Sequence, residues 1–385
     1  MNVFETSLRR ISDLILAATA DRTPLRICGT GSKDFYGESL QGEVLDTTAL
    51  CGITSYEPTE LVVTARAGTP LAELEAALAE KGQCLPFEPP RFGAHGGGTV
   101  GGMVAAGLSG PSRASVGALR DYVLGAEIIN GRGELLTFGG QVMKNVAGYD
   151  VSRLMVGAMG TLGLITQVSL KVLSTAPAEA TLMCAGLSQQ VALDLLNRWG
   201  GQPLPLNASC WVYDVTASPA QDYLFIRLRG AVAAVEAACP RMVADVLAAG
   251  GDAVRMDNAQ AMPDWQACRD QTMPFFNAPS PEMGLWRLSV PQTAPVLKLP
   301  YAQFIEWHGG LRWCWAPLGA QELLKKEASG VGGAASLFIA PVANSTEPCT
   351  KFSPLNSSLN LIHQRLKAEF DPAGIFNRGR LNANL

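Results

Sequence analysis

The chain has 385 residues, of which 48% are hydrophobic and 17% are charged, and its formal net charge is −4. This apolar composition excludes a disordered chain, and the slight negative charge offers no electrostatic surface for nucleic acid. No apolar run reaches the roughly 20 residues of a membrane-spanning helix, so we expect a cytoplasmic protein. The length of the chain is enough for two or three domains.

The N-terminal part of the sequence predicts a helix followed by short strands. Residues 1–20 mix charged and apolar side chains at helical spacing, which indicates an amphipathic helix rather than a signal peptide. Buried strands are expected over residues 25–28 and 61–67. Thr69 and Pro70 are suited to begin a helix that continues to Ala79.

Further strands complete a first domain, which we place over residues 1–176. They are expected at 123–130, at 134–138 after an Asn-Gly turn, and at 163–172. Helices and strands in this irregular order indicate an α+β fold rather than a repeated βαβ unit.

A second domain is expected over residues 177–350, because glycine becomes less frequent and strands alternate with Ala/Leu-rich helices there. This pattern predicts an antiparallel sheet covered by helices. The predicted helices are 188–199 and 231–249, and the predicted strands are 209–214 and 223–229. Residues 351–385 form a last segment, with a helix over 359–370 and a tail, which we expect to return to the first domain.

Four glycine-dense clusters lie in the first half of the chain, at residues 28–33, 95–107, 144–150 and 157–165. Glycine loses much backbone entropy on folding, so dense glycine usually marks tight turns or a backbone close to a ligand. Four clusters indicate a large, extended, anionic ligand. We expect two of the loops to offer backbone N–H groups to one pyrophosphate, with hydroxyl donors from Thr30, Ser32 and Thr99.

Two nucleotide-binding alternatives fit the glycine clusters less well. Residues Gly96 to Gly101 match the pattern Gly-x-Gly-x-x-Gly. A dinucleotide-binding turn needs a strand immediately before this pattern, whereas a proline-rich segment precedes it here, which disfavours that interpretation. Gly29 to Lys33 lacks the spacing of a nucleoside-triphosphate loop. The nine cysteines form no Cys-x-x-Cys pair, so we expect reduced thiols, no iron–sulfur cluster and no metal site.

The order of these motifs resembles the vanillyl-alcohol-oxidase-type (PCMH-type) FAD-binding family. The resemblance rests on Gly-Thr-Gly-Ser at 29–32, Thr-Val-Gly-Gly-Met-Val-Ala at 99–105, Lys-Asn-Val-Ala-Gly-Tyr-Asp at 144–150 and Gly-Thr-Leu-Gly at 160–163. The segment 370–381 looks like the end of that family's 2-hydroxy-acid oxidase branch. Residues 306–313 look most like the flavin subunits of glycolate oxidase.

The resemblance implies a PCMH-type FAD-binding domain of two α+β subdomains, followed by an α+β cap domain. It also implies a set of cofactor-binding residues: Gly29, Thr30, Gly31, Ser32, Lys33, Pro90, Gly98, Thr99, Val100, Gly101, Gly102, Ala105, Ala106, Gly107, Arg120, Asp121, Gly157, Gly160, Thr161, Gly163 and Ile165. No histidine stands in the 29–33 loop, where covalently flavinylated relatives carry one, so we expect non-covalent FAD.

The activity implied is oxidation of glycolate to glyoxylate, with electrons passed to an iron–sulfur subunit. The expected partners are that subunit, a second flavin subunit and a small 2-hydroxy acid, with peripheral membrane association through the complex. Two alternatives stay open. In the first, the chain is a non-catalytic assembly subunit that keeps the FAD fold. In the second, it is a D-lactate-type 2-hydroxy-acid dehydrogenase.

Oxidation of a 2-hydroxy acid needs a base for the hydroxyl proton and a cation for the carboxylate. Our candidates are His308 as base, Arg312 as carboxylate anchor and Lys144 facing the flavin. Each has a structural alternative: a hydrogen-bonded histidine, a guanidinium stacked on neighbouring tryptophans, and a lysine that anchors a turn.

Overall fold

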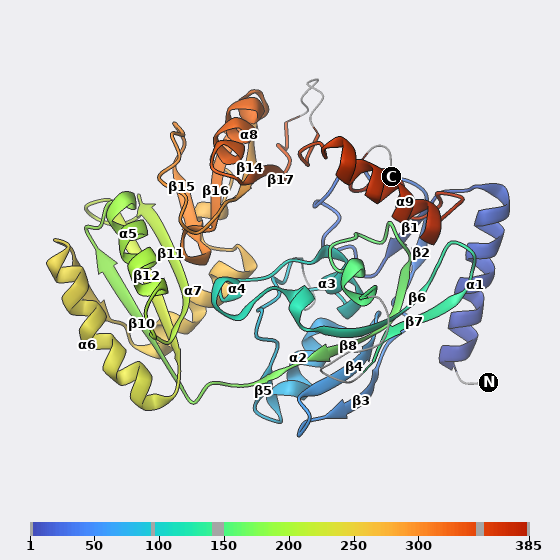
Figure 1. The fold of residues 1–385 in the computed structure, drawn as a ribbon, viewed down its shortest axis with the longest axis horizontal. Coiled ribbons are helices and arrows are strands. Elements are labelled where there is room, and N and C mark those ends of the chain that lie inside the picture. The colour runs from blue at the N-terminus through green and yellow to red at the C-terminus, as the bar shows by residue number, and fades with distance from the viewer. Residues whose placement is uncertain (1–2, 94–96, 141–149, 344–349, 383–385) are drawn as a thin grey trace. The chain divides into compact units, whose positions relative to one another are not determined.

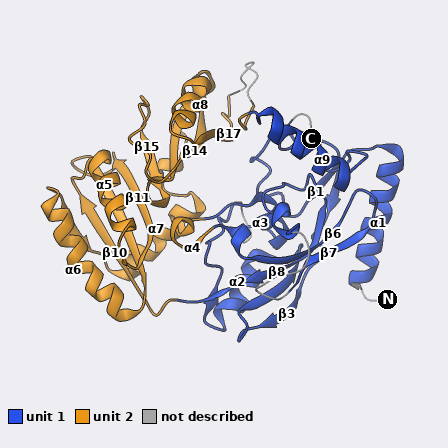
Figure 2. Cartoon of the chain, viewed as in Figure 1, with its two compact units in different colours: residues 1–109, 118–175, 354–385 blue, residues 110–117, 176–353 orange. Residues whose placement is uncertain are grey.

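The computed structural model describes residues 3–93, 97–140, 150–343 and 350–382, and it divides the chain into two compact units (Figures 1 and 2). Unit 1 holds residues 1–109, 118–175 and 354–385, and unit 2 holds 110–117 and 176–353. These divisions lie close to the expected ones at residues 176 and 350. The segment Gly110–Gly117, expected in the first domain, belongs to unit 2 instead.

Unit 1 is built on a five-stranded sheet whose paired strands are all antiparallel. Its strands are β3 (Ile53–Glu57), β4 (Val62–Arg66), β8 (Leu164–Lys171), β6 (Val123–Ile129) and β7 (Leu135–Gly139), in that spatial order. Central β8 is buried along most of its length, whereas edge strand β7 alternates between half-buried and exposed residues. Its buried positions hold apolar residues together with Thr166 and Ser169, whose hydroxyls form hydrogen bonds with the Glu127 carbonyl and the Thr64 hydroxyl.

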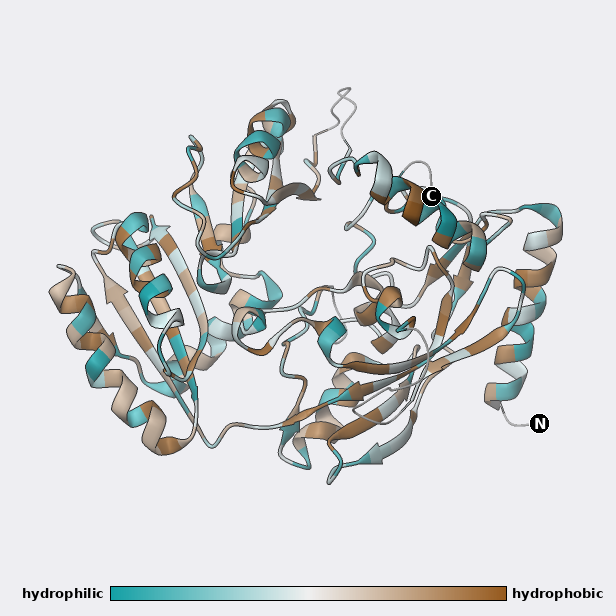
Figure 3. Ribbon diagram, in the orientation of Figure 1, coloured by the Kyte–Doolittle hydropathy of each residue, from teal (hydrophilic) through white to brown (hydrophobic). Residues whose placement is uncertain are grey.

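Shorter elements surround this sheet. They are α1 (Val3–Asp21), the parallel pair β1 (Leu25–Cys28) and β2 (Glu43–Asp46), α2 (Leu71–Ala79), α3 (Val100–Ala106), the short pair β5 (Gln83–Cys84) and β9 (Leu173–Ser174), η1 (Leu119–Asp121), η2 (Ser152–Met155) and α9 (Ser357–Phe370). Helix α1 carries hydrophobic and hydrophilic residues in alternation along its length (Figure 3). Its Ile11, Ile15 and Ala18 are buried in a cluster that also contains Phe376, so the N- and C-terminal segments share one core.

A buried ion pair anchors the C-terminal segment to unit 1. Lys367 Nζ lies 2.7 Å from Asp371 Oδ2 and donates to the carbonyls of Thr161 and Phe376. Asp371 in turn accepts from the backbone N–H groups of Ile375 and Phe376. Burial lowers the pKa of Lys367, while the Asp371 carboxylate opposes that shift.

Unit 2 contains an eight-stranded sheet in which neighbouring strands of the described residues pair in antiparallel fashion. Its spatial order is β13 (Asp252–Arg255), β10 (Ala178–Ala185), β12 (Gln221–Gly230), β11 (Leu206–Asp214), β15 (Gln303–Glu306), β16 (Leu311–Pro317), β14 (Met283–Ser289) and β17 (Ala334–Ile339). The helical elements are α4 (Arg113–Val116), α5 (Gln189–Gly200), α6 (Val232–Ala248), α7 (Asn258–Asp270), η3 (Pro274–Phe276), η4 (Trp307–Gly309), η5 (Leu318–Ala320) and α8 (Gln321–Gly330).

The buried faces of α5 and α6 explain why this sheet forms a domain. Leu193, Leu196 and Trp199 of α5 and Met242 of α6 pack in one cluster with strand residues such as Ile226. The expected antiparallel sheet with covering helices is therefore present, and the α+β fold class is confirmed. Mixed helices and antiparallel sheets occur in both units.

Candidate cofactor site

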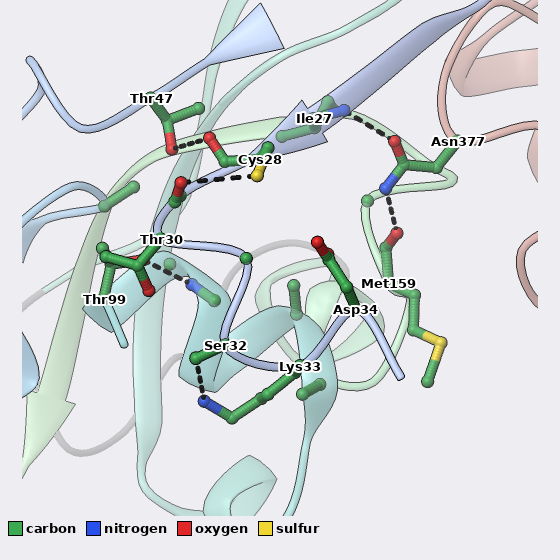
Figure 4. Close-up of a pocket in the computed structure, with 18 of the residues that line it drawn as sticks. Ile27, Cys28, Thr30, Ser32, Lys33, Asp34, Thr47, Thr99, Met159 and Asn377 are labelled. Carbon is green, nitrogen blue, oxygen red and sulfur yellow. Dashed lines mark hydrogen bonds between the residues drawn. The ribbon is translucent and has the colours of Figure 1, made fainter. Parts of the chain in front are cut away.

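A pocket in unit 1 brings together segments that are far apart in the sequence (Figure 4). They are the loop after β1, helix α3 with the residue before it, the turn before β8 and the segment after α9, and Thr47 and Ala67 add one residue each from the ends of β2 and β4. The residues lining it are Ile27, Cys28, Gly29, Thr30, Gly31, Ser32, Lys33, Asp34, Tyr36, Leu40, Thr47, Ala67, Thr99, Gly101, Gly102, Ala105, Ala106, Met159, Gly160, Ile165, Asn377 and Arg380.

The loop from Gly29 to Lys33 begins where strand β1 ends. The Cys28 carbonyl accepts from the Thr47 N–H at 2.9 Å and from the Thr47 hydroxyl at 3.2 Å, which closes the pairing with β2. Beyond it, the backbone N–H groups of Gly29 through Lys33 donate to no acceptor within the described part of the chain. Gly31 has a φ of +70°, so this turn requires glycine. Successive N–H groups left without protein acceptors in a pocket-lining loop suit an anion.

Lys33 adds a positive charge to this loop. Its Nζ lies 3.3 Å from the Gly97 carbonyl and 3.5 Å from Ser32 Oγ (Figure 4), and no ion pair is formed by Lys33 among the described residues. Burial lowers the pKa of Lys33 to about 8. Burial removes part of the water that would stabilise this ammonium group, and the group has no carboxylate partner in its place. A bound anion would stabilise its charged form instead.

Part of the second glycine cluster, at the start of α3, has acceptors within the protein for its backbone N–H groups. The N–H groups of Val100 and Gly101 donate to the carbonyls of Thr69 and Ala67, and that of Gly102 donates to Thr99 Oγ1. These donors are therefore used within the protein rather than offered to a ligand. A Cβ on Gly101 would lie 2.7 Å from the Ala67 Cβ, so this glycine permits close packing of α3 against the end of β4.

Many of the residues that the sequence suggested for the cofactor line this one pocket. They are Gly29, Thr30, Gly31, Ser32, Lys33, Thr99, Gly101, Gly102, Ala105, Ala106, Gly160 and Ile165. The others named in the sequence analysis do not line it: Pro90, Gly98, Val100, Gly107, Arg120, Asp121, Gly157, Thr161 and Gly163.

Some of the residues outside the pocket have clear structural roles instead. Arg120 and Asp121 are exposed and pair with each other at 3.9 Å. A Cβ on Gly107 would lie 2.9 Å from the Gly157 backbone, so these two glycines allow two segments to approach closely. The Thr161 hydroxyl donates to the Ala158 carbonyl at 2.7 Å and so closes a turn.

Two pocket residues of the C-terminal segment were not among the sequence candidates. Asn377 accepts from the Ile27 N–H at 2.7 Å and donates to the Met159 carbonyl at 2.6 Å (Figure 4). The guanidinium of Arg380 donates to the carbonyls of Asp34, Tyr36 and Glu38 and thereby holds the chain that follows Lys33. The sequence suggested that residues 351–385 return to the first domain, but no motif around Asn377 or Arg380 indicated that these side chains contact the pocket.

His308, our candidate base, lies in unit 2 and does not line this pocket. Its Nδ1 lies 2.9 Å from Ser209 Oγ and its Nε2 lies 2.9 Å from Ser115 Oγ. Burial lowers its pKa to about 4, so the imidazole is neutral at pH 7. A neutral, fully hydrogen-bonded imidazole matches the structural alternative that the sequence left open.

Arg312 also lies in unit 2, and its side chain is fully buried. Its guanidinium donates to the carbonyls of Gly309, Pro295 and Ala294, at 3.2, 2.6 and 2.7 Å. Because backbone oxygens take up Nε, Nη1 and Nη2, the contacts favour a structural role over that of carboxylate anchor. Lys144, the third candidate, falls outside the described residues.

The described residues contain no group of three or more His, Cys, Asp or Glu side chains that could hold a metal ion. The described cysteines, Cys28, Cys51, Cys84, Cys184, Cys210, Cys239, Cys268 and Cys314, are all free thiols. Among the helices of the described ranges, none has the length and apolar character needed to cross a bilayer.

Comparison with known proteins decides the family. The FAD binding domain family matches residues 3–139. Over 368 residues the chain is 43% identical to glycolate oxidase subunit GlcE of Escherichia coli strain K12, covering 96% of this chain and 95% of that protein. The chain belongs to the GlcE family. As a member of this PCMH-type flavoprotein family, it is an FAD-binding protein related to oxidoreductases.

More distant relatives share part of the chain with this GlcE-family member. It is 30% identical over 175 residues to glycolate oxidase subunit GlcD of Bacillus subtilis strain 168, which spans 45% of this chain and 37% of that protein. It is 28% identical over 216 residues to a D-2-hydroxyglutarate dehydrogenase of Xanthomonas citri, 56% of this chain and 43% of that one. The fold matches an alkyldihydroxyacetonephosphate synthase structure with a TM-score of 0.68 at 14% identity, covering 96% of this chain and 74% of that one.

The pocket fits the cofactor of the family. FAD carries a pyrophosphate, and the 29–33 loop offers N–H groups without protein acceptors and the Lys33 ammonium on one side of the pocket. Small residues, among them Ala105, Ala106 and Gly160, line other parts of it and leave space for the body of a large ligand. Both the family and the chemistry of the residues present therefore support FAD as the cofactor.

Proposed function

We propose that this chain is the FAD-carrying subunit of a glycolate dehydrogenase of the oxidase type. In this proposal it oxidises glycolate to glyoxylate and passes the electrons to an iron–sulfur partner subunit, alongside a second flavin subunit. The observation that supports it most is the 43% identity to GlcE over nearly the full length of both proteins. The 29–33 loop with Lys33 would hold the pyrophosphate, with Asn377 fixing the strand before this loop and Arg380 fixing the chain after it.

Oxidation of glycolate removes a hydride from the carbon that carries the hydroxyl and a proton from that hydroxyl. When bound, FAD supplies the ring that accepts the hydride. The chain would contribute cofactor binding, a carboxylate anchor and a proton acceptor. The absence of a histidine from Gly29 to Lys33 supports a non-covalent cofactor.

The test is an absorbance spectrum of the purified full chain, followed by acid precipitation and anaerobic addition of glycolate. We expect flavin absorbance, FAD in the acid supernatant and bleaching with glycolate. Flavin that stays with the precipitate would contradict non-covalent binding. D-lactate, added in place of glycolate, distinguishes the lactate-type alternative, since that enzyme would bleach faster with D-lactate.

A second candidate is a non-catalytic assembly subunit that keeps the FAD fold. The contacts of His308 and Arg312 favour it, because the polar nitrogens of both side chains already form hydrogen bonds with other groups of unit 2. This candidate predicts an FAD-loaded chain that neither glycolate nor D-lactate bleaches, but that restores glycolate oxidation when mixed with its partner subunits.

A further inference from the structure

A small pocket in unit 2 is lined by strands of the sheet and by helix α7. Its lining residues are Thr181, Cys210, Phe225, Met256, Ala261, Asp264, Trp265, Cys268 and Met273. Asp264 is exposed, whereas Cys210 and Cys268 are buried, so the pocket leads from the surface to two cysteines in the interior. Both cysteines are free thiols.

Three side chains meet at the buried end of this pocket. Cys210 of β11 and Glu306 of β15 are direct partners in the antiparallel pairing, so both side chains leave the sheet on the same face. From α7, Cys268 Sγ donates to Glu306 Oε1 at 3.3 Å, and the Cys268 thiol is also hydrogen-bonded to the Cys210 thiol. Trp313 Nε1 donates to Glu306 Oε2 at 2.7 Å and thereby fixes the carboxylate beside the thiols.

The contact between the two thiols suits formation of a covalent bond. A disulfide requires two cysteines whose sulfur atoms can approach without movement of the backbone. Because Cys210 and Cys268 already form a hydrogen bond, only a small movement of their side chains is needed. The bond would join strand β11 to helix α7 within one unit.

The pocket also has room for an oxidant. Its cavity has a volume of about 30 Å³. One water molecule needs roughly 10–15 Å³ of such space, and hydrogen peroxide is only slightly larger than water. A peroxide molecule therefore fits in the pocket that Cys210 and Cys268 line.

We propose that Cys210 and Cys268 form a redox-active pair, which hydrogen peroxide converts into a disulfide. The Cys268 thiol passes its proton to Glu306, and its sulfur attacks one peroxide oxygen. This step breaks the O–O bond, forms a sulfenic acid and releases hydroxide, which takes the proton from Glu306 and becomes water. The Cys210 sulfur then attacks the Cys268 sulfur, and the hydroxyl group leaves as water with the Cys210 proton. Two thiols and one peroxide thus give one disulfide and two water molecules.

The surroundings of the pair make this reaction slow. The hydrogen bond with Cys210, burial and the neighbouring Glu306 carboxylate all raise the pKa of the Cys268 thiol well above its usual value. Only the thiolate attacks peroxide, so the pair would stay reduced until peroxide persists. Oxidation removes the hydrogen that Cys268 donates to Glu306, the residue directly before the turn at Trp307 and His308.

The test is a peptide map of the full FAD-loaded chain after treatment with hydrogen peroxide. Remaining thiols are alkylated before digestion with trypsin, and no reductant is added. Trypsin cleaves after arginine and lysine, so Cys210 lies in peptide 199–227 and Cys268 in peptide 256–269, each without another cysteine. We expect one linked species, lighter by two hydrogen atoms than the two peptides together, which dithiothreitol separates again.

Variants and pH show whether this pair is responsible. The linked species should be lost in Cys210→Ser and in Cys268→Ser. Its yield should be unchanged in Cys239→Ser, the matched control, because Cys239 is a buried cysteine of α6 in the same unit that does not line the pocket. The rate of linkage should rise by up to about tenfold for each pH unit from pH 7 to 9, as the thiolate fraction grows.

Three results would overturn the proposal, which does not depend on the proposed function. The first is sulfinic acid on either peptide without the linked species, because the thiols would then be oxidised separately. The second is a pair that stays reduced at pH 9 while the urea-unfolded chain is oxidised. The third is an equal yield of the linked species from the urea-unfolded chain, because contact in the folded unit would then not be the cause. The map of the unsubstituted chain decides between these results even where a serine variant does not fold.

Discussion

Lys33 should make FAD affinity depend on pH. In the free protein its pKa is about 8, so the ammonium form dominates at pH 7 and is lost progressively above pH 8. A bound pyrophosphate raises that pKa, so the complex keeps the proton that the free protein loses. The Kd for FAD should therefore be flat below pH 8 and rise by up to about tenfold for each pH unit above it.

The size of the Lys33 contribution follows from its contacts. A hydrogen bond to a charged group contributes about 1.5–3 kcal/mol, so Lys33→Met should weaken FAD binding at pH 7 by about 10- to 150-fold. Lys33→Arg keeps a charge that does not titrate in this range, so it should bind FAD without the rise above pH 8. Lys81→Met is the control, because Lys81 is exposed and does not line the pocket.

The assay is equilibrium titration of the FAD-free full chain with FAD at constant ionic strength between pH 6.5 and 9. Flavin fluorescence reports the bound fraction. The reasoning fails if Lys33→Met binds FAD as tightly as wild type, or if it keeps the same rise in Kd above pH 8. Either result would place the pyrophosphate away from the 29–33 loop.

Three further predictions concern the segments that hold each unit together. Asn377→Ala leaves the Ile27 N–H without its acceptor and should lower the free energy of unfolding by about 1–3 kcal/mol in urea titrations, with Asn360→Ala near wild type; equal losses would contradict this role. Lys367→Met strands the buried Asp371 carboxylate and should cost about 3–5 kcal/mol, while Lys367→Met with Asp371→Asn should cost less than the two single changes together; strict additivity would argue against the pair. For His308 the folded pKa of about 4 lies below the unfolded value of about 6.5, so unfolding takes up a proton between these values and stability falls as pH drops through that window, by up to about 1.4 kcal/mol per unit. His308→Gln should remove that slope in urea titrations from pH 4.5 to 7.5, and identical slopes in both proteins would refute the assignment.

Local patterns in the sequence were sufficient to locate one loop that lines the pocket. Gly29 to Lys33 directly follows the short strand β1, and the change from an apolar run to a glycine-rich turn can be read from adjacent residues. Strands such as β8 and the Asn-Gly turn at Asn130 were recognisable for the same reason: Asn130 Oδ1 accepts from the N–H groups of Arg132 and Glu134 within the turn itself.

Contacts between distant segments could not be predicted in this way. The Asn377 side chain accepts a hydrogen bond from the Ile27 N–H, and the residues next to Asn377 in the sequence do not indicate this partner. The role of Gly101 depends on Ala67, which lies on a different element. Arg312 stands among tryptophans in the sequence, but backbone carbonyls from the chain before β15 determine its surroundings. The placement of Gly110–Gly117 in unit 2 likewise depends on contacts with Trp307 and His308.

The bond between Ile27 and Asn377 joins residues that are 350 positions apart, and it has a consequence for biosynthesis. The ribosome must make Asn377 and Arg380 before the 29–33 loop can be held in its final conformation. A nascent chain that stops earlier contains the glycine loop but not the residues that clamp it. A chain that ends before Asn377 should therefore retain FAD less tightly than one that includes Asn377 and Arg380.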